Sequence, residues 1–192
     1  MRLFYAAFLD LENRSSYESL IAKVIAEEGN VVRPVPSGSQ HQTLGFLGEI
    51  DDREVGKYVA ILDITKGMPE IPFTLRHPKI LFGRGNPRLV CADLHEGSDR
   101  VLALQKALRL ELGEDPSTIG RRLKHPHVTL ARFKRNASRA VAQKVIDALA
   151  RLEEPSLVRT DRLSSVHLVK STLTPSGPIY ESLAESMLGS AL

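Results

Sequence analysis

The chain has 192 residues, of which 42% are hydrophobic and 26% are charged, and its formal net charge at pH 7 is +3. This is the composition of an ordinary folded globular protein, and the basic excess is too small to indicate a nucleic-acid partner by itself. The single cysteine, Cys91, lies in an apolar run, which excludes an internal disulfide or a cysteine metal site. No stretch is long and apolar enough to span a membrane, and no clear signal peptide is present, so we expect a cytoplasmic protein.

The first half is predicted to begin with a buried strand over residues 2–9, followed by a helix. Ser15 and Glu18 form a capping-box pattern, and apolar residues then recur at helical spacing up to a stop at residues 29–30. An extended, proline-containing segment over residues 31–36 leads into a strand at about 42–48. Asp51 and Asp52 begin a second helix, and residues 71–82 are predicted to form the next strand.

The second half is predicted to follow a hairpin turn at residues 83–87, which we interpret as the junction between halves. A strand over 88–94 precedes a third helix that Ser98 caps and Gly113 ends. A polar loop over 114–124 then leads to a strand at residue 127 and to a fourth helix over 141–152. Strands over 157–162, 165–170 and 179–181 follow, and the tail from Glu185 is expected to fray.

Two copies of the pattern His-x-Thr-Leu stand out, beginning at His41 and, 86 residues later, at His127. An internal repeat at half the chain length indicates two related halves. Because residues i and i+2 of a strand share a face, each copy would present one imidazole and one hydroxyl together and bury its leucine on the opposite face. A single copy would indicate an ordinary strand histidine, whereas two symmetric copies predict a cleft that both histidines face.

Two imidazoles at one site are suited to general acid–base catalysis, since histidine both accepts and donates a proton near pH 7. One would deprotonate a nucleophile while the other protonates a leaving oxygen. The hydroxyls of Thr43 and Thr129 would donate hydrogen bonds to phosphate oxygens. This pattern favours displacement at a phosphodiester and requires no metal or other cofactor.

A metal site is the alternative, because His41, His125 and His127 could together hold a catalytic zinc. No carboxylate or cysteine lies beside either motif, and Pro126 places His125 at the entrance of the strand. We therefore predict no metal site and interpret His125 as a residue of the cleft rim. The other histidines, which have no matching threonine, are interpreted as structural or exposed: His77, His95 and His167.

Basic residues gather around the second motif. Arg132 follows Thr129 by three positions, which places it on the opposite strand face unless the strand ends or bulges. A charge run usually lies on a solvated surface, but beside a phosphate site it would attract RNA. The candidate RNA-binding residues are Arg33, Arg121, Arg122, Lys124, Arg132, Lys134 and Arg135.

The paired motifs, with residues 46–49 after the first and 131–132 after the second, resemble those of the two-histidine phosphoesterases. Within that superfamily the match is to the RNA 2′,3′-cyclic phosphodiesterases, also called 2′-5′ RNA ligases. Residues 2–6 and 168–180 resemble the family too, so the likeness covers nearly the whole chain. It implies one two-lobed α+β domain over residues 1–192, with approximate halves 1–88 and 89–192 that can interleave. The lobes would be related by a pseudo-twofold duplication, with two antiparallel sheets around a central cleft and helices outside.

The resemblance also implies hydrolysis of RNA 2′,3′-cyclic phosphate ends to 2′-phosphomonoesters, and in some members 2′-5′ ligation by the reverse chemistry. His41 carries over as the proton donor to the leaving 3′ oxygen, His127 as the proton acceptor that activates water, and Thr43 and Thr129 as phosphate ligands. The geometry alone allows the histidines to exchange these roles.

The expected partners are RNA ends or nucleotide 2′,3′-cyclic phosphates, with no membrane, and the expected state is a monomer. The chain lacks Trp, and family members often have an aromatic residue where Pro34 stands, so base recognition by stacking is expected to be weak. The alternative from another class is a binding module, in which the cleft would hold a nucleotide or RNA end without turnover.

Overall fold

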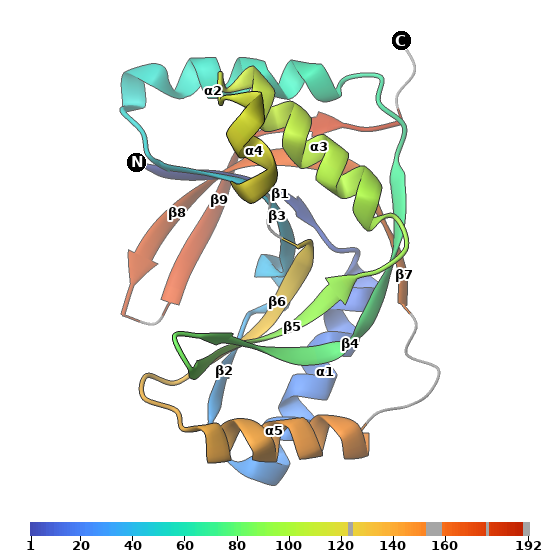
Figure 1. Ribbon diagram of the computed structural model, residues 1–192, viewed down its shortest axis with the longest axis vertical. Coiled ribbons are helices and arrows are strands. Elements are labelled where there is room, and N and C mark those ends of the chain that lie inside the picture. The colour runs from blue at the N-terminus through green and yellow to red at the C-terminus, as the bar shows by residue number, and fades with distance from the viewer. Residues whose placement is uncertain (123–124, 153–158, 176, 190–192) are drawn as a thin grey trace.

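The structure is a computed structural model that describes residues 1–122, 125–152, 159–175 and 177–189 (Figure 1). Within them are five α-helices: α1 (Leu11–Glu28), α2 (Val55–Ile61), α3 (Ser98–Glu111), α4 (Pro116–Arg122) and α5 (Arg139–Leu152). The nine strands of this part of the chain are β1 (Arg2–Phe8), β2 (Val32–Pro34), β3 (His41–Glu49), β4 (Ile71–Gly83), β5 (Asn86–Leu94), β6 (His127–Phe133), β7 (Arg159–Leu163), β8 (Ser165–Thr174) and β9 (Gly177–Met187). None of the described helices is long and apolar enough to cross a membrane.

The strands form one antiparallel sheet in the order β7-β4-β5-β6-β3-β1-β8-β9, with β2 paired to β6. The predicted α+β class is confirmed, but the expectation of two separate sheets is wrong. The two motif strands, β3 and β6, lie side by side and join the halves of the sheet through the pair Gln42 and Val128. Within the described residues, this is the one residue pair that β3 and β6 share.

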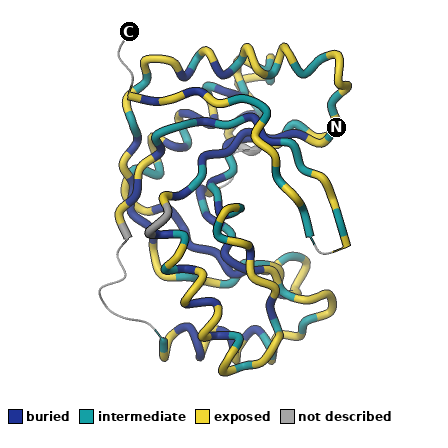
Figure 2. Tube along the Cα trace, turned by 180° about the vertical axis from the view of Figure 1, so that it is seen from behind, coloured by how far each residue is buried: buried dark blue, intermediate teal, exposed yellow. Residues whose placement is uncertain are grey.

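Helices cover the two ends of this sheet. α1 and α5 pack against each other and reach β4, β5 and β6, while α3 packs on β3 and β4. Figure 1 shows α1 with α5 at one end of the molecule and α2, α3 and α4 at the other. Figure 2, seen from behind, shows buried backbone along the central strands and exposed backbone toward the hairpin ends.

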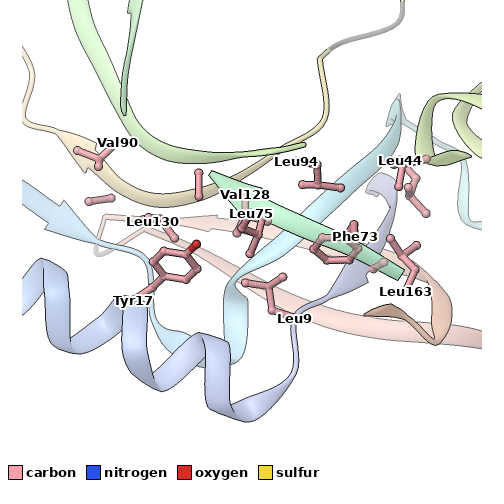
Figure 3. Close-up of a cluster of buried hydrophobic side chains, with 14 of the residues drawn as sticks. Leu9, Tyr17, Leu44, Phe73, Leu75, Val90, Leu94, Val128, Leu130 and Leu163 are labelled. Carbon is pink, nitrogen blue, oxygen red and sulfur yellow. The ribbon is translucent and has the colours of Figure 1, made fainter. Parts of the chain in front are cut away.

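The apolar faces of both motif strands enter the main hydrophobic core (Figure 3). Leu44, Val128 and Leu130 are fully or almost fully buried there, together with side chains of β1, β4, β5 and α1. Burying a large aliphatic side chain contributes about 1.5–3 kcal/mol, and a slip of one residue would expose the whole set. The core therefore fixes which face of each strand carries histidine and threonine.

Both motif strands carry a bulge directly after their threonine. The pairing of β3 with β1 leaves Leu44 without a partner, and the pairing of β6 with β5 does the same for Leu130. These leucines occupy equivalent places in the repeat. Because a bulge adds one residue to one strand, it re-aims the side chains that follow. The residues two positions further on, Phe46 and Arg132, are thereby turned to the side of the histidines and threonines.

Local capping moved several predicted boundaries. α1 begins at Leu11 rather than at Ser15, because Oδ1 of Asp10 accepts a hydrogen bond of 2.7 Å from the backbone N–H of Asn13. The predicted loop over 114–124 contains α4, where Asp115 accepts in the same way from the N–H of Ser117 at 2.8 Å. The predicted fraying from Glu185 is wrong for residues 185–187, which pair with β8, and the last three residues of the predicted tail lie outside the described residues.

Candidate active site

The pairing of β3 with β6 sets the four motif side chains against one another. In an antiparallel ladder, the residues that flank a pair face each other across the strands. His41 therefore lies across from Thr129, and Thr43 lies across from His127. All four residues line one cleft of about 660 Å³. The structure thus brings together the two histidines and two threonines that the repeat singled out.

Each histidine ring is oriented by the same backbone contact. Nδ1 of His41 lies 2.7 Å from the carbonyl oxygen of Ser39, and Nδ1 of His127 lies 2.9 Å from the carbonyl oxygen of His125. A carbonyl oxygen can only accept, so Nδ1 carries the hydrogen in both rings. When the ring is neutral, Nε2 is then the unprotonated nitrogen. The two Nε2 atoms are therefore the atoms available for proton transfer.

Aromatic rings enclose His41. Its ring centroid lies 5.1 Å from that of Phe4, 5.2 Å from that of Tyr180 and 5.8 Å from that of Phe8. Burial lowers the pKa of His41 to about 4; the backbone hydrogen bond opposes this shift, and the positive charge of Arg132 adds to it. The neutral imidazole therefore dominates at this position in the free protein at pH 7.

A buried carboxylate supports the second motif instead. Oδ2 of Asp93 lies 3.3 Å from Nε2 of His125 and also contacts Nζ of Lys79. Asp93 is the cross-strand partner of His127 in the pairing of β5 with β6. His125 lines the cleft, as expected for a residue of its rim. A carboxylate thus anchors the residue whose carbonyl oxygen orients His127.

The zinc alternative gains no support from the donor geometry. In the described ranges, no group of three or more His, Cys, Asp or Glu side chains is arranged to hold a metal ion. Nε2 of His125 is turned toward Asp93, and Nδ1 of both His41 and His127 is engaged by a carbonyl oxygen. The contact of His125 with Asp93 removes its Nε2 from a shared site with His41 and His127.

The cleft lining is basic. Arg2, Arg88, Arg109 and Arg132 line it, and none of the described lining residues is Asp or Glu. Arg109 is bound to Glu114 at 2.8 Å, whereas the other three arginines have no carboxylate partner in the part of the chain that the structure describes. The bulge in β6 explains why Arg132 reaches the cleft. Positive charge without compensation in a cleft attracts anions such as phosphate.

Aromatic residues that the motif search missed also line the cleft. Phe46 is 63% exposed and stands with its ring centroid 6.0 Å from that of Phe4, and Phe82 and Tyr180 line other parts of the wall. The chain has six Phe, four Tyr and no Trp, and four of these ten rings line the cleft: Phe4, Phe46, Phe82 and Tyr180. Period-two alternation along β1 could have indicated that Phe4 and Phe8 share a face, but only the tertiary fold brings Phe82 and Tyr180 to them.

Among the predicted RNA-binding residues whose side chains the structure describes, only Arg132 lines the cleft. Arg33 is the cross-strand partner of Arg132 without lining the cleft. The others are distributed along the chain: Lys134 and Arg135 are exposed after β6, Arg121 and Arg122 belong to α4, and Lys124 lies outside the described residues.

Several known proteins are similar to this chain. A family model described as LigT like Phosphoesterase matches residues 94–180. The RNA 2′,3′-cyclic phosphodiesterase of Thermus thermophilus is 35% identical over 98% of this chain and 90% of its own length, and that of Thermotoga maritima is 29% identical over 96% and 94%. Among solved structures, TT0787 of Thermus thermophilus has a TM-score of 0.75 at 28% identity, covering 98% of both chains. Escherichia coli LigT complexed with 3′-AMP has a TM-score of 0.69 at 23% identity, covering 97% of both chains.

Proposed function

Since the chain belongs to the RNA 2′,3′-cyclic phosphodiesterase family and is a phosphoesterase, we propose that its cleft hydrolyses RNA 2′,3′-cyclic phosphate ends by proton transfer between two histidines. The observation that carries the proposal is the matched orientation of His41 and His127. Both Nδ1 atoms donate to a backbone carbonyl, which leaves both Nε2 atoms for a phosphate in one cleft.

In the proposed reaction, Nε2 of His127 takes a proton from a water molecule whose oxygen attacks phosphorus. The bond from phosphorus to the 3′ oxygen breaks, and Nε2 of His41 gives that oxygen a proton. The products are a 3′-hydroxyl and a 2′-phosphomonoester. Thr43 and Thr129 donate hydrogen bonds to the non-bridging oxygens, and Arg132 balances the charge that accumulates on them. No step requires a metal ion.

The donor role requires a protonated His41, although burial lowers its pKa to about 4 in the free chain. A bound phosphodiester brings a negative charge next to the ring, and an opposite charge within about 4–6 Å favours the charged imidazole. We propose that substrate binding raises the pKa of His41 in this way. The exchanged assignment, in which neutral His41 is the base and His127 the acid, is the second candidate, and the low pKa of free His41 favours it.

The repeat also bears on how the two halves are related. An offset of 86 residues relates the motifs, the bulged leucines and the orienting carbonyls of Ser39 and His125, so we infer that the halves arose by duplication.

We further propose a second reaction for the catalytic pair. His41 and His127 would also catalyse attack by an RNA hydroxyl in place of water, which forms a 2′-5′ linkage. All four motif residues come from one chain, so a monomer suffices for either reaction.

The direct test is incubation of the purified protein with a nucleoside 2′,3′-cyclic phosphate, with and without EDTA, and identification of the product by phosphorus NMR. The expected result is a 2′-phosphate, formed at the same rate after exhaustive chelation. Loss of activity on chelation with recovery on added zinc would favour the metal alternative. Stoichiometric binding without product would favour the binding module.

A further inference from the structure

Two β-hairpins, β8 with β9 and β4 with β5, project from the sheet (Figure 1), and residues of both line the cleft. β8 pairs with β1 through residues 167–170, but its pairing with β9 continues from Ser171 to Thr174. The end of this hairpin therefore has no neighbouring strand other than its own partner within the described residues, and Figure 2 shows it as an arm beside the main body. β4 and β5 form the second hairpin.

Near their tips, both hairpins present apolar side chains to the cleft. Leu173 and Pro178 are cross-strand partners near the tip of one hairpin, and Leu81 and Phe82 lie near the tip of the other. Leu173 is 67% exposed and Phe82 is 49% exposed, so neither contributes much to the core. Large apolar side chains that gather at one exposed place mark an interaction site. Their position in the cleft indicates a ligand that also occupies the catalytic site.

The apolar pair lies beyond the catalytic phosphate position. Tyr180, the cross-strand partner of Ser171, packs on His41 with a centroid distance of 5.2 Å. Leu173 and Pro178 are two residues further along the same hairpin, a separation of about 7 Å at roughly 3.4 Å per residue. The sugar and phosphate of one further nucleotide can span that separation. Arg88 lines the same cleft and has no carboxylate partner in the described part of the chain.

We propose that the two hairpin tips bind the base of the penultimate nucleotide of an RNA that ends in a 2′,3′-cyclic phosphate. Arg88 then contacts the phosphate that joins this nucleotide to the terminal one. This inference rests on the proposed function and deepens it, because it makes an oligonucleotide rather than a mononucleotide the preferred substrate. Leu173, Pro178 and Phe82 offer apolar surface to the face of any base, so the subsite accepts all four bases.

The test compares three substrates: a 2′,3′-cyclic mononucleotide, a dinucleotide ending in the cyclic phosphate, and the same dinucleotide with an abasic penultimate residue. We expect wild-type kcat/KM to be about tenfold higher for the complete dinucleotide than for the abasic one. Leu173→Ser should reduce this ratio to about one. Ile179→Ser is the matched control, because Ile179 is 60% exposed on the same hairpin but does not line the cleft, and it should preserve the ratio.

Two results would overturn the subsite while leaving the proposed function intact. One is equal wild-type kcat/KM for the complete and abasic dinucleotides, and the other is an equal loss on mononucleotide and dinucleotide in Leu173→Ser. If no substrate is turned over, the proposed function fails, and calorimetry with dinucleotide 2′-phosphates then judges the subsite. Tighter binding of the complete dinucleotide than of the abasic one, lost in Leu173→Ser, supports it, and equal affinities contradict it.

Discussion

The two motif strands place the same atoms in two different environments. His41 is surrounded by aromatic rings, and burial lowers its pKa to about 4. His127 has no aromatic ring against it within the described residues and stands beside His125 and the carboxylate of Asp93. The repeat therefore supplies a matched pair of imidazoles with the same tautomer, and residues outside the repeat make the pair unequal. In acid–base catalysis one ring must accept a proton while the other donates one, and this difference in surroundings bears on which ring takes which role.

The two motif strands also differ after their bulges, in the side chain that each presents to the cleft. At equivalent positions the wall of the cleft formed by β3, the first wall, presents Phe46, and the wall formed by β6, the second wall, presents Arg132. An aromatic ring favours contact with a base, whereas a guanidinium favours contact with phosphate oxygens. If the cleft binds a nucleotide as proposed, the two walls divide its recognition between them, although they are built from the same strand pattern.

Removing either imidazole is expected to have the largest effect. His41→Ala and His127→Ala should each lower kcat/KM on a cyclic nucleotide by about 10²–10⁴-fold, the typical contribution of a proton carrier. Circular dichroism and thermal melting would establish that the variants are folded. If both folded variants keep near wild-type turnover, the catalytic hypothesis is wrong and the binding module replaces it.

The pH dependence of the residual activity would decide which ring donates. His127→Ala retains His41, whose pKa in the free protein is about 4. If His41 is the donor, its charged form is required, and kcat/KM of the variant falls as pH rises through that value. If His41 is the base, its neutral form is required, and kcat/KM rises over the same range. The sign of the slope thus tests the proposed assignment against the exchanged one.

The same low pKa predicts a loss of stability in acid. His41 titrates near 4 in the folded chain and near its ordinary value of 6.5 in the unfolded chain. Between pH 4 and 6.5 the unfolded chain binds a proton at this histidine and the folded chain does not. The stability that His41 contributes is therefore fully present above pH 6.5 and is lost as the pH falls toward 4. The loss is at most about 3–4 kcal/mol in the free energy of unfolding. Urea unfolding of wild type and His41→Asn across this range would measure it.

Asparagine is chosen because its amide can still donate to the carbonyl of Ser39 but does not titrate. In His41→Asn, the free energy of unfolding should therefore change much less between pH 4 and pH 6.5 than in the wild type. His127→Asn, the same change at the equivalent position, is the matched control. A slope in His41→Asn as steep as in wild type would mean that other groups cause the acid sensitivity.

Patterns within one strand were enough to predict the motif faces. Alternation along β3 and β6 predicts that histidine and threonine share a side, and the burial of Leu44 and Leu130 agrees with it. The turn residues at 83–87 likewise predict the hairpin of β4 and β5. The side of Arg132 could not be predicted, because the bulge at Leu130 depends on how β5 pairs with β6. A bulge is a property of two strands, and one strand's sequence does not reveal it.

The residues that surround the two histidines also could not be predicted from patterns in the sequence. Tyr180 lies 139 residues from His41 in the chain, and only the order β3-β1-β8-β9 brings the two rings to 5.2 Å. Asp93 similarly reaches His125 through the pairing of β5 with β6. Such contacts are set by sheet order, which leaves no periodic signal in the chain. The placement of the two histidines in one cleft could thus be predicted, but the difference between their surroundings could not.

A smaller effect is expected for the charge on the second wall. Arg132→Met should lower kcat/KM by about 10–100-fold, since a hydrogen bond to a charged group is worth about 1.5–3 kcal/mol. It should also raise the pKa of His41, because the positive charge of Arg132 lowers it. NMR titration of the His41 ring would measure that shift. Arg100→Met, at an exposed arginine of α3 outside the cleft, controls for the loss of one positive charge.

The smallest effect on activity is expected for changes to the residues that hold the two orienting carbonyls, those of Ser39 and His125, in place. Ser39 ends a 3₁₀ turn over residues 37–39, in which the N–H of Gln40 donates to the carbonyl of Ser37. Beside the carbonyl of His125, the N–H of Leu94 donates to the carbonyl of Pro126 at 3.0 Å, and the side chain of His125 contacts Asp93. We infer that the contact with Asp93 helps to hold that carbonyl in place. Asp93→Asn should therefore loosen His127 and leave His41 in place. We expect a loss of about tenfold in kcat, the cost of one weakened hydrogen bond.

Nitrogen NMR of the ring separates positioning from simple destabilisation. In Asp93→Asn, His127 should show a mixture of its two neutral tautomers, because Nδ1 no longer donates to one fixed carbonyl, whereas His41 should keep a single tautomer. Lys79→Met is the control, since it removes the other partner of Asp93 without altering His125; it should lower stability and leave the tautomer of His127 unchanged. A single His127 tautomer and wild-type kcat in Asp93→Asn would mean that both carbonyls are held by backbone alone.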